Sequence, residues 1–277
     1  MYIQKIYRMR NTIDVERYHS ARYGAPGEKR KPKRKLTSDQ IKEKNFEQAK
    51  RNLKRLINAN FGPGDFHCTL TYRKENRPDQ EEAKKKLSNF LLRMKRHYKT
   101  HDAELKYIVV TEYENKAIHH HMIINKIPET TDLINKLWKD GRAHFSILDN
   151  VGDYKLLAEY LIKETDKTFR SEDSANTKRD TRSRNLIIPE AEKKIITASS
   201  FRKNPKPMKG YYIDPESMYQ GINPVTGYAY QTYTLIRMDY GESRYLHSAR
   251  PERTEIRKRK IYRGYRIKRE ECHKNTK

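Results

Sequence analysis

Residues 64–164 change the spacing of their hydrophobic side chains from one segment to the next, and this ordered change constrains the fold more than any other feature of the chain. Alternating hydrophobic and polar residues predict four strands, over residues 66–73, 107–114, 117–125 and 143–148. Spacings of three and four predict three helices, over residues 79–97, 130–140 and 152–167. The order is therefore β-α-β-β-α-β followed by one more helix.

That order is the split βαβ plan, which forms a ferredoxin-like or RRM-like antiparallel sheet. We therefore expect an α+β fold in which the first and third strands are central neighbours. Two helices should cover one face of the sheet, and the last helix should lie near the open face.

The second and third predicted strands flank Asn115 and Lys116, which predicts a hairpin with a two-residue turn. In that register Glu112 lies directly across from His119, and His121 shares their face because side chains alternate along a strand. The opposite face of the hairpin is mostly apolar and would pack on the helices. Two strand histidines alone are more often structural, but with a facing carboxylate they are typical of a divalent-metal site. The sequence thus predicts metal ligands at Glu112, His119 and His121.

The first predicted strand places His67, Thr69 and Thr71 on one face. If this strand neighbours the histidine strand, the two hydroxyls flank the metal face and could hold a DNA phosphate. β-Branched residues are also ordinary in a central strand, so both interpretations stay open for each threonine.

The last predicted helix carries Tyr160 and Lys163, which are neighbours on a helix because they are three residues apart. A phenol beside a cation and a metal-activated phosphate is a competent nucleophile for covalent catalysis, although this spacing alone is more often found on an ordinary surface helix. Tyr154 lies six residues earlier, about 240° around the helix. We therefore expect a single nucleophile, Tyr160.

Three segments, taken in order, resemble the three motifs of the HUH endonucleases, which initiate rolling-circle replication in plasmids and phages. They are Phe66-His-Cys-Thr-Leu-Thr-Tyr72, Ile118-His-His-His-Met-Ile-Ile124 and Tyr160-Leu-Ile-Lys163. The amino-terminal arm and Arg182-Ser-Arg-Asn-Leu186 are also similar to the filamentous-phage-type replication proteins of this group. In the family two metal histidines flank one hydrophobic residue. The resemblance therefore assigns metal binding to His119 and His121 and places His120 between them.

The resemblance implies that the chain cuts and rejoins single-stranded or hairpin origin DNA, with DNA contacts at Arg182 and Arg184. Tyr160 would attack the scissile phosphate, leaving a 5′-phosphotyrosine and a free 3′-hydroxyl, and Lys163 would orient the tyrosine or the phosphate. Mg²⁺ or Mn²⁺ suits phosphate chemistry better than Zn²⁺, which imidazoles would also accept. The chain has no Gly-Lys pair and so no P-loop. A host helicase and a host polymerase are therefore the implied partners.

Composition favours a nucleic-acid partner and a reducing compartment. The 61 lysines and arginines outnumber the 36 acidic residues, and the formal net charge of +25 favours a polyanion. Two cysteines are too few for a disulfide framework, and no segment approaches the roughly 20 apolar residues that a membrane span needs. We expect a cytoplasmic protein with no membrane partner. The alternatives are an HUH transposase or relaxase, and a non-catalytic nucleic-acid-binding protein whose charge alone supplies the affinity.

Three regions of the chain differ in composition. We expect a basic amino-terminal arm and helix over residues 1–60, the HUH domain over 61–190, and a basic, tyrosine-rich appendage over 191–277. Thr37 and Gln40 predict a capping box at the start of the first helix. The tyrosines of the last region either stack on bases or form the core of a small β-rich unit, which we favour. The basic segment 253–269 is expected to contact the DNA backbone.

Overall fold

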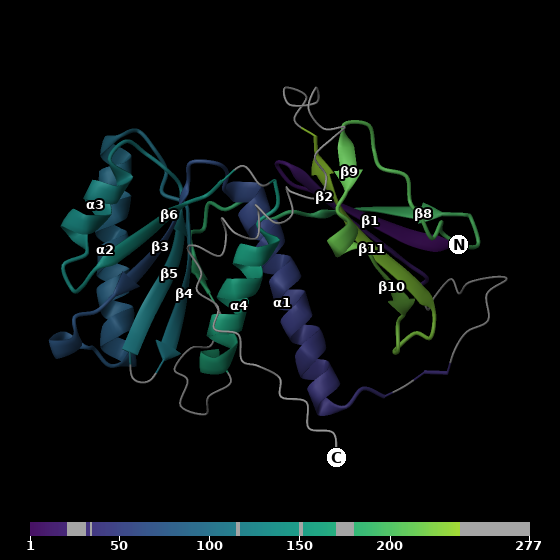
Figure 1. The fold of residues 1–277 in the computed structure, drawn as a ribbon, viewed down its shortest axis with the longest axis horizontal. Coiled ribbons are helices and arrows are strands. Elements are labelled where there is room, and N and C mark those ends of the chain that lie inside the picture. Colours follow the sequence, from purple (N-terminus) through teal and green to yellow (C-terminus); the bar gives the residue numbers. More distant parts are fainter. Residues whose placement is uncertain (21–31, 34, 115–116, 150–151, 170–179, 239–277) are drawn as a thin grey trace, which may run out of the picture. The chain divides into compact units, whose positions relative to one another are not determined.

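The computed structural model describes residues 1–20, 32–33, 35–114, 117–149, 152–169 and 180–238, and Figure 1 shows how their helices and strands are connected. All of these except Met238 belong to one compact unit, Met1–Arg237, and the second unit is Met238–Lys277. Within the described ranges, no helix is both long enough and apolar enough to cross a lipid bilayer. The basic segment 253–269 lies outside the described residues.

One five-stranded antiparallel sheet carries the predicted fold. Its strands are β3 (Phe66–Thr71), β4 (Tyr107–Glu114), β5 (Ala117–Ile124), β6 (Ala143–Ile147) and β7 (Thr181–Arg182). They lie in the order β6-β3-β5-β4-β7, and each pair is antiparallel. The predicted α+β fold is confirmed, and so is the central pairing of β3 with β5. The short strand β7, which the sequence did not predict, extends the sheet beside β4.

The register of the sheet agrees with the predicted hairpin. Glu112 on β4 faces His119 on β5. On the other side of β5, Thr69 of β3 faces His121 and Thr71 faces His119. Because facing residues of antiparallel strands point to the same side, these polar side chains share one face of the sheet.

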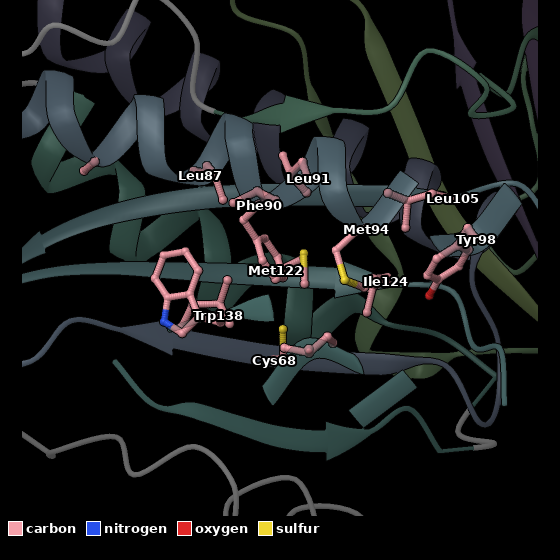
Figure 2. Packing of buried hydrophobic residues seen from close by; sticks show 14 of the residues in the cluster. Cys68, Leu87, Phe90, Leu91, Met94, Tyr98, Leu105, Met122, Ile124 and Trp138 are labelled. Atoms are coloured by element: carbon pink, nitrogen blue, oxygen red, sulfur yellow. The ribbon is translucent and has the colours of Figure 1, made fainter. Parts of the chain in front are cut away.

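Helices α2 (Gln80–Thr100) and α3 (Thr130–Leu137) cover the opposite face, and Figure 2 shows the buried side chains between α2 and the strands. α2 begins where Asp79 Oδ1 accepts a hydrogen bond from the Glu82 backbone N–H at 2.8 Å. This N-cap satisfies a backbone donor that has no partner within the helix. The buried stripe of α2 consists of Ala83, Leu87, Phe90, Leu91, Met94 and Tyr98. Burial of this stripe holds α2 on the sheet.

Helix α4 (Lys155–Phe169) packs against β4, and α1 (Ser38–Asn60) packs on α4 (Figure 1). The predicted capping box at the start of α1 is confirmed. The Gln40 backbone N–H donates to Thr37 Oγ1 at 3.3 Å, and the Thr37 backbone N–H donates to Gln40 Oε1 at 3.1 Å. Two backbone donors at the helix start are thus satisfied reciprocally.

Near the end of α1, the Asn58 side chain fixes the start of α4. Asn58 Nδ2 donates to Asp153 Oδ1 at 2.7 Å, and Asn58 Oδ1 accepts from the Tyr154 backbone N–H at 3.0 Å. Since α4 carries Tyr160, this amide helps to set where Tyr160 lies over the sheet.

A second antiparallel sheet contains segments from both ends of the first unit. Its strands are β1 (Tyr2–Arg8), β2 (Thr12–Tyr18), β8 (Ala191–Ile196), β9 (Tyr211–Ile213), β10 (Tyr219–Ile222) and β11 (Ala229–Arg237). They lie in the order β10-β11-β2-β1-β8, and β9 also pairs with β11. The amino-terminal strands thus pair with the carboxyl-terminal ones, where the sequence predicted an arm and an appendage. The division of the chain at residues 60 and 190 stays a prediction.

Strands β1 and β2 escaped the sequence analysis because only one of their faces is apolar. On that face Ile6, Ile13 and Val15 pack with Tyr233 and Leu235 in a small buried cluster. The intervening residues are mostly polar or charged, and in the sequence they give the segment the composition of a solvated arm.

Buried ion pairs explain how that charged face is covered. Lys54 Nζ of α1 lies 2.7 Å from Asp14 Oδ1, and Arg55 Nε lies 2.8 Å from Asp14 Oδ2. Arg55 Nη2 also lies 2.6 Å from Glu16 Oε1. Charged residues of β2 are therefore neutralised by a helix that lies more than thirty residues away in the sequence.

Candidate active site

A carboxylate and an imidazole are directly bonded on the polar face of the five-stranded sheet. His121 Nε2 lies 3.0 Å from Glu112 Oε2, and both side chains are buried. Because an ionised carboxylate only accepts hydrogen bonds, His121 donates from Nε2. Its Nδ1, which lies 3.2 Å from Thr69 Oγ1, is then free to accept from the Thr69 hydroxyl. The predicted neighbours Glu112, His121 and Thr69 thus meet.

The environment of Glu112 keeps its carboxyl group ionised. Burial raises the pKa of Glu112, but hydrogen bonds from His121 and Glu164 and the charges of His121 and His119 together lower it by more, so the net pKa lies below its usual value. An ionised carboxylate in a mostly buried place favours binding of a cation.

The donor set fits a divalent cation, although the described residues contain no group of three histidine, cysteine, aspartate or glutamate side chains already placed around an ion. Two ligands at right angles, each at about 2.1 Å from one ion, are about 3 Å apart. Glu112 Oε2 and His121 Nε2 have that separation, and His119 faces Glu112 across the strands. Loss of the His121 proton on metal binding would free Nε2 as a ligand.

Tyr160 of α4 lies against two histidines of the sheet. Its ring centroid is 5.4 Å from that of His121, at an interplanar angle of 89°, and 6.4 Å from that of His67, at 80°. The rings of His67 and His121 stack at 5.7 Å. The fold therefore brings the predicted nucleophile next to a predicted metal ligand.

His67 is almost completely buried beside this group, with 3% of its surface exposed. Burial and the charge of His121 lower the pKa of His67 to about 3, so the ring is neutral near pH 7. The DNA contact of His67 stays a prediction, and the burial of the ring favours a supporting role beside His121.

The other predicted site residues lie around the same face. Lys163 is exposed on α4, and the Thr71 hydroxyl donates to the Arg142 carbonyl at 3.2 Å. Arg182 faces Ile108 across β7 and β4, which places it on the Glu112 side of the sheet, and Arg182 pairs with Asp180 at 3.1 Å. Arg184 is exposed just after β7. Their DNA contacts stay predictions.

The middle histidine of the three points away from this site. His120 Nε2 lies 2.8 Å from the Tyr72 hydroxyl and His120 Nδ1 lies 2.9 Å from Thr111 Oγ1, on the face covered by α2 and α3. Burial, with the charges of His121 and His119, lowers the pKa of His120 to about 3. Two hydroxyl partners thus allow a neutral histidine where the HUH pattern has a hydrophobic residue.

Two further residues clarify the site. Glu164, which the sequence analysis missed, hydrogen-bonds Glu112. Its spacing of four residues from Tyr160 on α4 would have revealed it. Tyr154, by contrast, is buried, and its hydroxyl donates to the Asp149 carbonyl at 2.9 Å. Tyr154 therefore has a structural role at the start of α4.

Comparison with known proteins points in one direction. No curated protein and no solved structure matched the chain. Residues 65–168, which run from the start of β3 into α4 and include Glu112, His119, His121 and Tyr160, match the family model of the ORF2-type replication-associated proteins. The match covers less than half of the chain, and it supports a role for this protein in the initiation of replication.

Proposed function

We propose that this protein initiates rolling-circle replication by cutting and rejoining single-stranded origin DNA through a 5′-phosphotyrosine link. The observation that carries the proposal is the contact between Tyr160 and His121, because it puts a phenol beside an imidazole that is hydrogen-bonded to Glu112. The match to a replication-associated family supports the same conclusion.

Glu112, His119 and His121 would hold a divalent cation, with Mg²⁺ or Mn²⁺ preferred over Zn²⁺ for phosphate chemistry. A bound cation supplies positive charge that polarises the scissile phosphate. Glu112 provides the negative charge of the ligand set, because its lowered pKa keeps it ionised near neutral pH.

In the cutting step, the Tyr160 oxygen forms a bond to phosphorus while the bond from phosphorus to the 3′ oxygen breaks. The phenol gives up its proton and the departing 3′ oxygen takes one up, which leaves a 5′-phosphotyrosine and a free 3′-hydroxyl. In the rejoining step, a 3′-hydroxyl attacks the same link and Tyr160 regains its proton. Lys163, exposed one helical turn after Tyr160, would orient the tyrosine or the phosphate.

The freed 3′-hydroxyl would prime synthesis by a host polymerase. A host helicase would separate the strands, since the sequence has no P-loop signature. Extension of that hydroxyl around a circular template distinguishes an initiator from a transposase or relaxase, which would form the same tyrosine link.

A covalent-adduct assay tests the proposal. Random single-stranded oligonucleotides labelled at the 3′ end are incubated with the protein and Mn²⁺, and the denatured products are separated on a gel. We expect labelled protein only when a divalent cation is present, with the nucleotide mapped to the peptide that contains Tyr160. Tyr160→Phe should abolish the adduct while DNA binding persists.

Tyr154→Phe is the matched control, because the Tyr154 hydroxyl is bonded to the Asp149 carbonyl and should not be needed for cutting. An adduct that persists in Tyr160→Phe would move the nucleophile to another residue. DNA binding by the wild-type protein without any adduct would favour a non-catalytic nucleic-acid-binding protein.

A further inference from the structure

The end of β3 and the start of β6 form a basic hollow that we call the β3–β6 cleft. It consists of two adjoining hollows of about 340 and 520 Å³, and Arg73 lines both. Its basic lining residues are Arg73, Lys74, Arg77, Lys86, Lys139 and Arg142. Acidic side chains also line the cleft, so the question is which of the basic charges are neutralised.

Only part of this positive charge is paired. Lys86 Nζ lies 3.1 Å from Glu82 Oε1 and 3.2 Å from Asp140 Oδ1. Arg73, Arg77, Lys139 and Arg142 are exposed, and none of them forms an ion pair with another residue in the described part of the chain. Clustered, uncompensated cations in a hollow attract a polyanion.

A close backbone contact positions the cleft. The Thr71 N–H donates to the Arg142 carbonyl at 2.9 Å, and the Arg73 N–H donates to the Asp140 carbonyl at 3.0 Å. Gly141 lies between them so close to β3 that an added Cβ would be 1.8 Å from the Thr71 carbonyl oxygen. Only glycine permits this approach, and it brings Arg73 and Arg142 next to each other.

The cleft opens beside the candidate active site. Thr71 faces His119 across β3 and β5, and Leu70 faces Ala143 across β3 and β6. Arg142, one residue before Ala143, is therefore level with Thr71, on the side of the sheet that carries His119. Two strand spacings, about 10 Å, separate the backbones of Arg142 and His119.

We propose that the β3–β6 cleft binds backbone phosphates of the DNA strand on one side of the scissile phosphate. Arginine side chains present a planar pair of N–H donors that matches phosphate oxygens. Contacts of this kind hold a strand in register without reading its bases. The location of the strand relative to the cut rests on the proposed function, whereas phosphate binding by the cleft does not.

The first experiment measures binding without cutting. Arg73→Ala/Arg142→Ala is made in a Tyr160→Phe protein, and its affinity for a random single-stranded 30-mer is measured in EDTA over a range of salt concentrations. We expect affinity to fall roughly tenfold or more. The slope of log affinity against log salt should become shallower by about 1.4, which corresponds to two lost phosphate contacts on a single strand.

The matched control is Lys95→Ala/Arg96→Ala, which also removes two exposed charges, from the helix α2 that covers the other face of the sheet. Its affinity and salt slope should stay close to those of the parent protein. Equal losses in the two double variants would overturn the cleft as a binding site, because net charge alone would then explain both.

The second experiment locates the strand. The oligonucleotide that is cut in the adduct assay is shortened from its 5′ or its 3′ end. One of the two truncations should weaken binding to the parent protein but not to the cleft variant, because the lost phosphates are those that the cleft holds. Equal sensitivity of both proteins to both truncations would contradict the proposal.

The two proposals fail separately. An adduct in the wild-type protein together with parental affinity and salt slope in the cleft variant would overturn the cleft alone. A wild-type protein that forms no adduct, but whose cleft variant loses DNA affinity, would overturn the cutting and leave the cleft.

Discussion

The aromatic rings of His121 and Tyr160 meet edge to face, with their centroids 5.4 Å apart and their planes at 89°. The contact connects strand β5 to helix α4 and places a phenol next to an imidazole that is bonded to a carboxylate. Tyr160 is therefore held beside the Glu112–His121 pair by packing, before any DNA is bound.

Glu112→Gln should weaken metal use without weakening DNA binding. Glutamine keeps the shape of the side chain and an oxygen that accepts from His121, but it removes the negative charge that a divalent ion requires. We expect the Mn²⁺ concentration for half-maximal adduct formation to rise roughly tenfold or more. Titration of Mn²⁺ in the adduct assay measures this.

Glu159→Gln on α4 is the matched control, because Glu159 is exposed and lies 3.5 Å from Lys50 Nζ at the helix surface. Its Mn²⁺ requirement should be that of the wild type. If Glu112→Gln shares that requirement, Glu112 is not a ligand.

His120→Leu should flatten the acid side of the stability profile. The pKa of His120 is about 3 in the folded protein, against about 6.5 in an unfolded chain. Below pH 6.5 the unfolded chain therefore binds a proton that the folded protein does not, so stability is complete above this pH and falls as the pH decreases. Removing His120 should reduce the slope by about 1.4 kcal/mol per pH unit between pH 6 and 4.5.

Urea unfolding at a series of pH values measures this slope. The comparison uses slopes because the loss of the Tyr72 and Thr111 hydrogen bonds also lowers the stability at every pH. A variant with the wild-type slope would show that His120 is protonated in the folded protein.

Asp14→Asn should destabilise the contact between α1 and the second sheet. It leaves the buried cations Lys54 and Arg55 without the carboxylate that both contact. Breaking one partner of a buried ion pair costs about 3–5 kcal/mol, and urea unfolding at neutral pH measures the loss. Asp39→Asn, which breaks only an exposed pair with Lys42, should cost less than about 1 kcal/mol. Equal losses would mean that the buried network contributes no more than a surface pair.

Gly141→Ala should damage both the fold and the cleft. The new Cβ would overlap the Thr71 carbonyl oxygen, so the turn must move away from β3. We expect a loss of about 1–3 kcal/mol in the free energy of unfolding, together with weaker single-stranded DNA binding. Urea unfolding and the salt-dependent binding assay measure the two effects.

Gly62→Ala is the control for Gly141→Ala, because its Cβ would meet only the flexible end of the Arg10 side chain. It should retain the parental DNA affinity. If Gly141→Ala also retains that affinity, the close approach of the two backbones is not what positions Arg73 and Arg142.

Local patterns predicted much of the fold. The capping box at Thr37, the helical stripe of α2 and the hairpin register that faces Glu112 with His119 all depend on residues near each other in the sequence. The period of two also separates His120 from His119 and His121, although it does not reveal the Tyr72 and Thr111 partners that make a buried histidine acceptable.

The same patterns failed where a polar surface is covered by a distant segment. Asp14 and Glu16 have the appearance of solvated residues, and only the docking of Lys54 and Arg55 shows why a strand can carry them inside. The strands β1 and β2 were missed for this reason.

The sequence by itself determined the order of the strands and helices around the site and the face on which Glu112, His119 and His121 lie, because side-chain alternation is a local property of the backbone. Only the tertiary structure decided that Tyr160 packs on His121 and that Arg142 lies beside Arg73. Those neighbours belong to different elements, and their meeting depends on the docking of α4 on β4 and of the Gly141 turn on β3.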